Sequence, residues 1–108
     1  MSIDNVLYHV GPGFEVSDDE GTIIAKMPAK TFKLGETTLT FEVDVLFHDD
    51  GEDQASHVFV DITIGSTEVY EGVDEYFEYW ANPQEIRDFV KKVTDKFKSE
   101  IMKMNFSF

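Results

Sequence analysis

The fold of this chain is decided by residues 37–64, TTLTFEVDVLFHDDGEDQASHVFVDITI. Apolar side chains occupy alternate positions in both arms of this stretch, and polar side chains fill most of the positions between them. An alternation of period two predicts a β-strand with one buried face. The acidic segment 49–56 separates the two arms, so the stretch predicts an antiparallel hairpin with a long polar loop.

The register of this hairpin depends on which face is buried. Pairing Phe47 with Val58 places the apolar residues of both arms on one face, and it brings Asp44 opposite Asp61 on the other face. Like charges directly opposite each other destabilise a sheet. A slip of two residues keeps the apolar face and changes these pairs. We predict the Phe47–Val58 register, with the slipped register as the alternative.

Further apolar runs lie between glycines at nearly even intervals, which is typical of an antiparallel meander. The runs that predict strands are 6–10, 14–16, 22–25, 30–34 and 67–71. Pro28 has no amide hydrogen to donate, so any strand near it lies at a sheet edge or begins after it. Residues 73–80 fit either a helix or a strand, and we expect a short helix or an irregular bridge.

The segment from Asn82 onward predicts one long helix. Asn82 is a favoured N-cap residue, Pro83 suits the first helical position, and Glu85 gives a capping-box pattern. Apolar side chains then recur on one helical face: Ile86, Phe89, Val90, Val93, Phe97, Ile101 and Met104. We expect the helix to end near Lys103, and residues 105–108 to form a short strand or to fold back on the core.

Basic side chains border this apolar face. One side carries Arg87, Lys91 and Lys98, and the other carries Lys92, Lys96 and Lys103. Such side chains can lie along apolar surface and keep their charged ends in water. The helix should bury Phe89, Val93 and Phe97 against the apolar strand residues Phe41, Val43, Val45, Val60 and Ile62.

The predicted fold class is therefore α+β. An antiparallel meander of five to seven strands should carry one long C-terminal helix on one face. With 108 residues, the chain is long enough for one hydrophobic core. We therefore expect residues 1–108 to form a single domain.

The chain is strongly acidic, with a formal net charge of −13. Residues 1–82 hold 18 acidic residues and three lysines, whereas residues 83–108 hold six basic and four acidic residues. The absence of cysteine excludes disulfides, thiolate catalysis and cysteine-based metal sites. No secretion signal or apolar run of bilayer length is present. These features predict a cytoplasmic protein, from a bacterium, a phage or a host cell.

Motifs of catalysis are missing from the sequence. It contains no glycine-rich phosphate loop, nucleophile elbow or paired histidine–carboxylate motif. His48 and His57 bracket the acidic loop, and imidazole with carboxylate is a metal-binding combination. However, Leu46 and His48 stand where an EF-hand loop needs its first acidic ligands. We therefore predict no enzymatic activity, no cofactor and no metal site.

Carboxylates and aromatic rings are the candidate functional groups. The predicted partner-binding residues are Glu42, Asp44 and Asp61 on the outward face, Asp49, Asp50, Glu52 and Asp53 in the loop, and Asp74, Glu75, Tyr76, Glu78 and Tyr79 beyond it. Same-face residues of one strand stand ~6.7 Å apart, so a sheet can display carboxylates as a regular array. Crowding of these carboxylates predicts raised pKa values among Asp44, Asp61 and the loop acids.

Such an array imitates the regular charge of nucleic acid, which its binding proteins meet with lysine and arginine. The sequence thus predicts a small acidic inhibitor that occupies the basic surface of a nucleic-acid-binding protein, without binding nucleic acid or membrane itself. In size and charge alone, the chain is analogous to small anti-restriction and anti-CRISPR proteins. The alternative is a protein–protein interaction module, such as a chaperone, immunity protein or accessory subunit, without nucleic-acid mimicry. The oligomeric state stays open.

Overall fold

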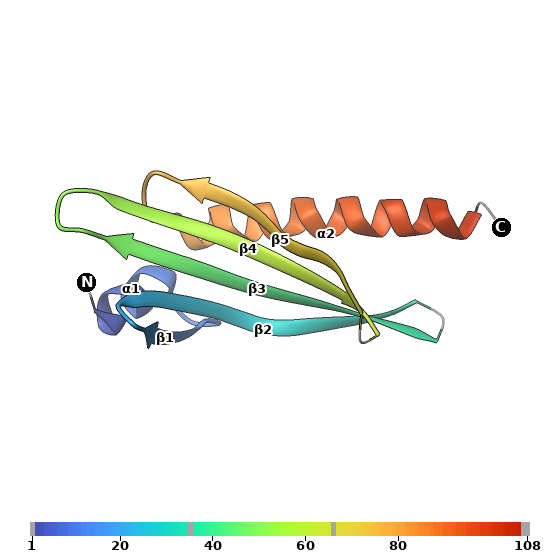
Figure 1. The fold of residues 1–108 in the computed structure, drawn as a ribbon, viewed down its shortest axis with the longest axis horizontal. Coiled ribbons are helices and arrows are strands. Elements are labelled where there is room, and N and C mark those ends of the chain that lie inside the picture. Colours follow the sequence, from blue (N-terminus) through green and yellow to red (C-terminus); the bar gives the residue numbers. More distant parts are fainter. Residues whose placement is uncertain (1, 35, 66, 107–108) are drawn as a thin grey trace.

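A computed structural model describes residues 2–34, 36–65 and 67–106, without the side chains of residues 34, 67–73 and 100–106. Its elements are α1 (Ile3–Val10), β1 (Glu15–Asp19), β2 (Thr22–Leu34), β3 (Thr37–Asp49), β4 (Gln54–Ile64), β5 (Thr67–Phe77) and α2 (Pro83–Phe106). The strands form one antiparallel sheet in the order β1-β2-β3-β4-β5 (Figure 1). The predicted α+β meander with a long C-terminal helix is confirmed.

The two faces of this sheet differ in what covers them. Side chains at alternate positions of β3, such as Phe41 and Phe47, are buried. They share one hydrophobic core with Val6 of α1 and with Ile86 and Phe97 of α2. Both helices therefore pack on the same face, which we call the covered face. We call the opposite face of the sheet the open face.

The molecule is elongated, with extents of 54 × 22 × 21 Å. Figure 1 shows the long strands running along its length, with α1 near the β3–β4 loop and the last turns of α2 towards the other end. Neither helix, as far as the described residues extend, combines the length and the apolar composition needed to cross a membrane.

The β3–β4 hairpin forms in the slipped register, so the predicted pairing of Phe47 with Val58 is wrong. Phe47 pairs with Ser56, and Asp44 faces Phe59 rather than Asp61. The loop spans only residues 50–53, because its carboxylates accept hydrogen bonds from the loop's own amides and close it tightly. Glu42, not Asp44, lies opposite Asp61.

The N-terminal segment is a helix, where the apolar run 6–10 predicts a strand. The Ser2 side chain accepts a hydrogen bond from the amide of Asn5 at 3.3 Å, which caps the helix start. Val6 and Val10, four residues apart, are the two buried residues of α1. A run of five residues is too short to distinguish the two periods.

The β1–β2 hairpin is tighter than predicted, because β1 continues to Asp19. Only Glu20 and Gly21 form its turn, and both have positive φ (51° and 91°). A two-residue turn with this backbone matches the twist of the flanking strands, and glycine adopts it without steric cost.

Strand β2 runs through Pro28 as one element, so the separate strand predicted at 30–34 is wrong. The ladder shifts register between Met27 and Lys30, which marks a β-bulge at Pro28. The pairing of β1 with β2 extends only as far as Glu15 opposite Lys26, so Pro28 lies in a part of β2 that pairs with β3 alone. The expectation of an edge position for Pro28 is correct.

Residues 73–77 continue β5, so the helix or bridge predicted for 73–80 is wrong up to Phe77. Asp74 pairs with Phe59, and Tyr76 pairs with His57. Strand pairing with β4 outweighs the local helical pattern, because β preference depends on cross-strand packing more than on the residues themselves.

Helix α2 begins as predicted. Asn82 Oδ1 accepts a hydrogen bond from the Glu85 amide at 2.8 Å, and Glu85 Oε1 accepts one from the Asn82 amide at 3.1 Å. This reciprocal pair is a capping box. Phe97 is buried edge-on against Phe41, whereas Phe89 and Val93 are partly buried. The helix continues to Phe106 rather than ending near Lys103, so residues 105–106 are helical and do not form a strand. The side chains of Ile101 and Met104 lie outside the described part of the structure, as do residues 107–108.

Candidate binding face

A row of mainly apolar side chains crosses the open face from one edge of the sheet to the other. The pairing of the strands sets its order, which is Ser17, Ile24, Leu46, His57 and Tyr76. Each member lies directly opposite the next on the neighbouring strand, so their side chains are in reach of one another. Tyr76 is 57% exposed, and Ile24, Leu46 and His57 are partly buried.

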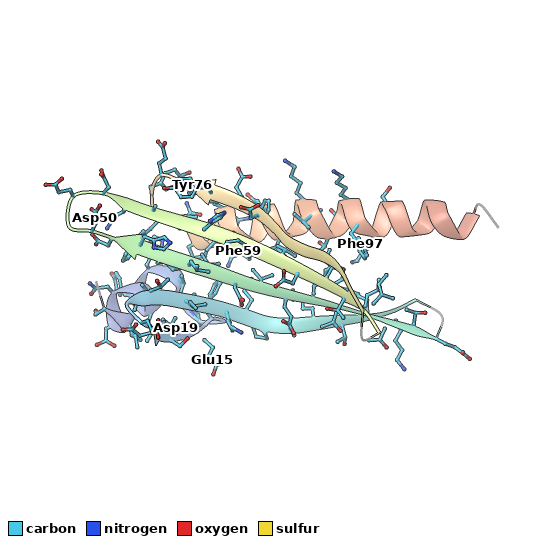
Figure 2. The ribbon with its side chains drawn as sticks, in the orientation of Figure 1. Glu15, Asp19, Asp50, Phe59, Tyr76 and Phe97 are labelled. Carbon is cyan, nitrogen blue, oxygen red and sulfur yellow. The ribbon has the colours of Figure 1, made fainter. Side chains whose placement is uncertain are left out.

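The next row is mainly charged. It runs Glu15, Lys26, Asp44, Phe59 and Asp74. Beyond it, Glu42 and Asp61 face each other across β3 and β4. The open face thus has an apolar and aromatic centre with carboxylates along one side. Figure 2 shows Phe59 midway along the sheet, with Tyr76 and Asp50 towards the loop end.

His57 is the best-fixed side chain of this centre. Its ring lies between the rings of Phe59 and Tyr76, with centroid distances of 4.2 Å and 5.5 Å. Its Nε2 atom is hydrogen-bonded to a carboxylate oxygen of Asp74. Aromatic contact on two sides and a hydrogen bond at the ring nitrogen hold the imidazole in one orientation. The centre is therefore an ordered surface rather than a set of independent side chains.

Asp44 and Asp74 are predicted carboxylates that contact cationic or imidazole groups on the open face. Lys26 Nζ lies 3.8 Å from Asp44 Oδ1, and Asp74 is bonded to His57. These side chains are partly exposed, so their mutual attraction is screened by water. A partner of the open face would compete with these contacts at little cost.

A hollow of about 870 Å³ lies at the loop end of the open face. We call it the acidic hollow; its lining residues are Gly21, His48, Asp49, Asp50, Asp53, Gln54, Ala55, Tyr76 and Glu78. It brings together loop acids and later residues that the sequence analysis predicted separately. Tyr76 belongs to both the hollow and the apolar row, so the two features are continuous.

The loop acids are ordered by their own backbone. Asp49 Oδ1 accepts a hydrogen bond from the Gly51 amide at 2.9 Å, and Asp50 Oδ1 accepts from Glu52 and Asp53 at 3.0 and 2.7 Å. The amides of Asp53 and Glu52 hold the pKa of the Asp50 carboxyl below its usual value. Crowding predicts a raised pKa for some of these acids, but Asp50 is not one of them, because its hydrogen bonds from the loop amides outweigh the effect of desolvation.

Three predicted residues lie away from the open face. The hydroxyl of Tyr79 donates a hydrogen bond to Glu85 at the start of α2, which raises the pKa of Tyr79. Glu75 pairs with Val58 in the register of the covered face, at the exposed edge of β5. Glu52 is exposed at the tip of the loop.

Four residues of the apolar centre were missed as binding residues: Ile24, Leu46, His57 and Phe59. The signal was present in the alternation, which places Leu46 and Phe59 on the polar face of their strands. Among the described residues, no group of three or more histidine, aspartate or glutamate side chains is arranged to hold a metal ion. His48 and His57 stand in different rows, and His57 is engaged by Asp74.

Comparison with known proteins gives no relative: no family model matches the chain, and no curated protein or solved structure is significantly similar to it. The function must therefore be argued from the open face itself. That face has apolar and aromatic side chains at its centre and carboxylates beside it.

Proposed function

We propose that this protein is a small acidic binding protein whose open face occupies a basic surface of a partner protein. The observation that carries the proposal is the apolar and aromatic centre of an uncovered sheet face, bordered by carboxylates. Protein interfaces commonly combine an apolar centre, enriched in aromatic residues, with a polar rim. Folding leaves Tyr76 largely exposed on this face, and binding would cover it.

The charge of the rim selects a basic partner. Asp49, Asp50 and Asp53 surround the acidic hollow, and Glu42 and Asp61 extend the negative surface along the sheet. A net charge of −13 attracts a basic surface from a distance and speeds association at low salt. Lysine and arginine surfaces of this kind are typical of nucleic-acid-binding proteins. We therefore propose that the protein inhibits such a partner by occupying its nucleic-acid site, in the cytoplasm.

A second candidate is a protein–protein interaction module without nucleic-acid mimicry. The ordered contact of His57 with Phe59 and Tyr76 favours it, because binding energy in such interfaces concentrates in a few aromatic anchors. A charge mimic instead distributes its binding energy over many carboxylates. The two candidates therefore differ in which variants abolish binding.

The experiment begins with affinity capture of a partner from lysate, with and without nuclease. The captured partner is then titrated at low and high salt with DNA or RNA as competitor. Inhibition by mimicry predicts binding that weakens steeply with salt and excludes nucleic acid. An interaction module predicts binding that survives salt and ignores nucleic acid.

Two variants separate the contributions of charge and aromatic contact. Reversal of Glu42, Asp44 and Asp61 to lysine should abolish binding by a mimic, whereas Tyr76→Ala should abolish binding by a module. Tyr79→Ala is the matched aromatic control, because Tyr79 is similarly exposed but lies off the open face. The matched charge control reverses three exposed acids elsewhere: Asp4, Glu36 and Asp88. If each control reduces binding as much as its test variant, the open face is not the binding surface.

A further inference from the structure

A groove lies on the covered face of the sheet, between α2 and the part of β2 that does not pair with β1. Its cavity measures about 370 Å³, within the range of small-molecule sites. Phe41 and Val43 of β3 and Val90 of α2 contribute apolar surface to it. Lys30, Arg87, Lys91 and Lys98 also line it. An apolar groove with a few charged groups is the usual composition of a ligand site.

The bulge at Pro28 explains why a lysine of β2 faces this groove. Between the pairs Met27–Val43 and Lys30–Phe41, β2 holds one residue more than β3. One extra residue reverses the side of the sheet to which the following side chains point. Without the bulge, Ala29 would stand opposite Phe41, and Lys30 would point to the open face.

The same reversal brings Phe32 into the groove. Its ring packs edge-on against Phe41 at 5.3 Å between centroids. Lys98 Nζ of α2 lies 3.9 Å from the centre of the Phe32 ring. Bulges often redirect a side chain next to a functional site. Here the bulge supplies the groove with both an apolar and a basic side chain.

The charge of the groove is opposite to that of the protein. Four of the nine basic residues of the chain line it, and Asp95 is its one acidic lining residue. Asp95 is paired with Lys91 at 2.8 Å, which leaves the other three basic side chains to set the charge of the groove. In a protein of net charge −13, this groove is a local region of positive charge.

We propose that this groove binds a small amphipathic anion, with an apolar chain against the sheet and a carboxylate or phosphate group at the basic residues. The complementary charge and the cavity volume support one single-chain ligand rather than a protein segment. If the basic side chains of α2 only lay along apolar surface, there would be no reason for three of them to line the same groove. The basic residues on the other side, including Lys92 and Lys96, do not line the groove.

The test uses decanoate as the probe, with decanol and decyltrimethylammonium as neutral and cationic analogues, all below their micelle concentrations. Calorimetric titration measures affinity, and amide chemical shifts locate the bound probe. Decanoate should bind saturably and at least about tenfold more tightly than decanol, because hydrogen bonds to a charged group are the stronger ones. Its affinity should fall as salt is added. This salt dependence is measured on the unaltered protein, so it does not depend on any variant.

A charge-reversed pair completes the test. Lys30→Glu with Arg87→Glu should weaken decanoate binding by about tenfold or more, since repulsion replaces attraction. Lys92→Glu with Lys96→Glu changes the net charge equally on exposed sites of the same helix and should leave affinity unchanged. The proposal is overturned by equal affinity for decanol, by equal loss in both variants, or by the absence of saturable binding. Amide chemical shift changes confined to the open face also overturn the proposal. So do changes in the groove that depend on protein concentration and not on decanoate, because these would indicate that a second copy of the chain occupies the groove.

Discussion

The covered and open faces of the sheet are built from the same strands, yet only the covered face is packed against helices. Phe47 on the covered face is fully buried and packs edge-on against the rings of His9 and Trp80. Phe59 on the open face lies beside His57 and between Asp44 and Asp74 of the neighbouring strands, and it stays partly exposed. Alternation alone assigns each phenylalanine to a face. The helices decide which face becomes a core.

This difference separates stability from function. The covered face is apolar along β3 from Leu39 to Phe47 and along β4 from Val58 to Ile64, and Ser56 is buried beside Phe47. The open face mixes apolar rings with carboxylates, which a core would not tolerate without partners. Changes on the covered face should therefore destabilise the fold, whereas changes on the open face should alter binding and spare the fold.

The largest expected effect is that of Phe47→Ala, which removes a fully buried ring. Such a truncation costs about 3–5 kcal/mol, because the lost burial is accompanied by a cavity. Phe59→Ala is the matched change on the open face and should cost much less. Chemical denaturation followed by circular dichroism measures both. Equal losses for the two variants would contradict the distinction between the faces.

Ser56→Ala tests a polar residue that is fully buried in the covered face. Ser56 Oγ donates a hydrogen bond to the Tyr79 carbonyl at 2.7 Å and accepts one from the Ala81 amide at 2.9 Å. Its loss leaves the buried Ala81 amide and the partly buried Tyr79 carbonyl without this partner, at a cost of about 1–3 kcal/mol. Ala55→Ser is the control, because it exchanges the same two residue types at the neighbouring position on the open face and leaves both hydrogen bonds of Ser56 in place. A Ser56→Ala variant as stable as wild type would show that this link between β4 and the segment joining β5 to α2 does not contribute to stability.

Much of the fold was predictable from local patterns. The two arms of residues 37–64, the meander and the capping box at Asn82 all rest on signals within a few residues of sequence. The register did not follow, because it depends on hydrogen bonds that the loop amides donate to the carboxylates of Asp49 and Asp50. Helix α1 was missed because the apolar run 6–10 is too short to distinguish a helical from a strand period. The hydrogen bond between His9 Nε2 and the carbonyl of Ala81, at 2.8 Å, joins residues too far apart in sequence to be predicted locally.

The candidate site was only partly predictable for a related reason. The sequence identified many of its carboxylates, and it also identified Tyr76. It could not order the rows, because the row that joins Leu46, His57 and Tyr76 exists only in the observed register. The basic groove depends on the bulge at Pro28, which reverses Lys30 to the helix side. A bulge changes the direction of the following side chains, but the amino-acid composition of the strand does not reveal it.

Asn82→Ala tests how firmly the covering helix is attached at its start. The variant loses the side-chain hydrogen bond to the Glu85 amide and should cost about 1 kcal/mol. Asn82→Asp retains an acceptor and should stay close to wild type, because aspartate is also a favoured N-cap residue. Thermal unfolding compares the three proteins. A loss for the aspartate variant as large as that for alanine would argue against capping as the cause.

The smallest expected effect concerns Asp50, whose charge borders the acidic hollow. Its folded pKa lies below the ordinary value because the amides of Asp53 and Glu52 stabilise the carboxylate. A group with a lowered folded pKa contributes stability above its unfolded pKa of about 4, and this contribution is lost as pH falls through the folded value. Asp50→Ala should therefore melt slightly below wild type at neutral pH, and the gap should narrow in acid. Glu52→Ala, at an exposed neighbouring position, should show no such narrowing. A gap that stays constant from neutral to acidic pH would mean that the charge of Asp50 is not what orders the loop.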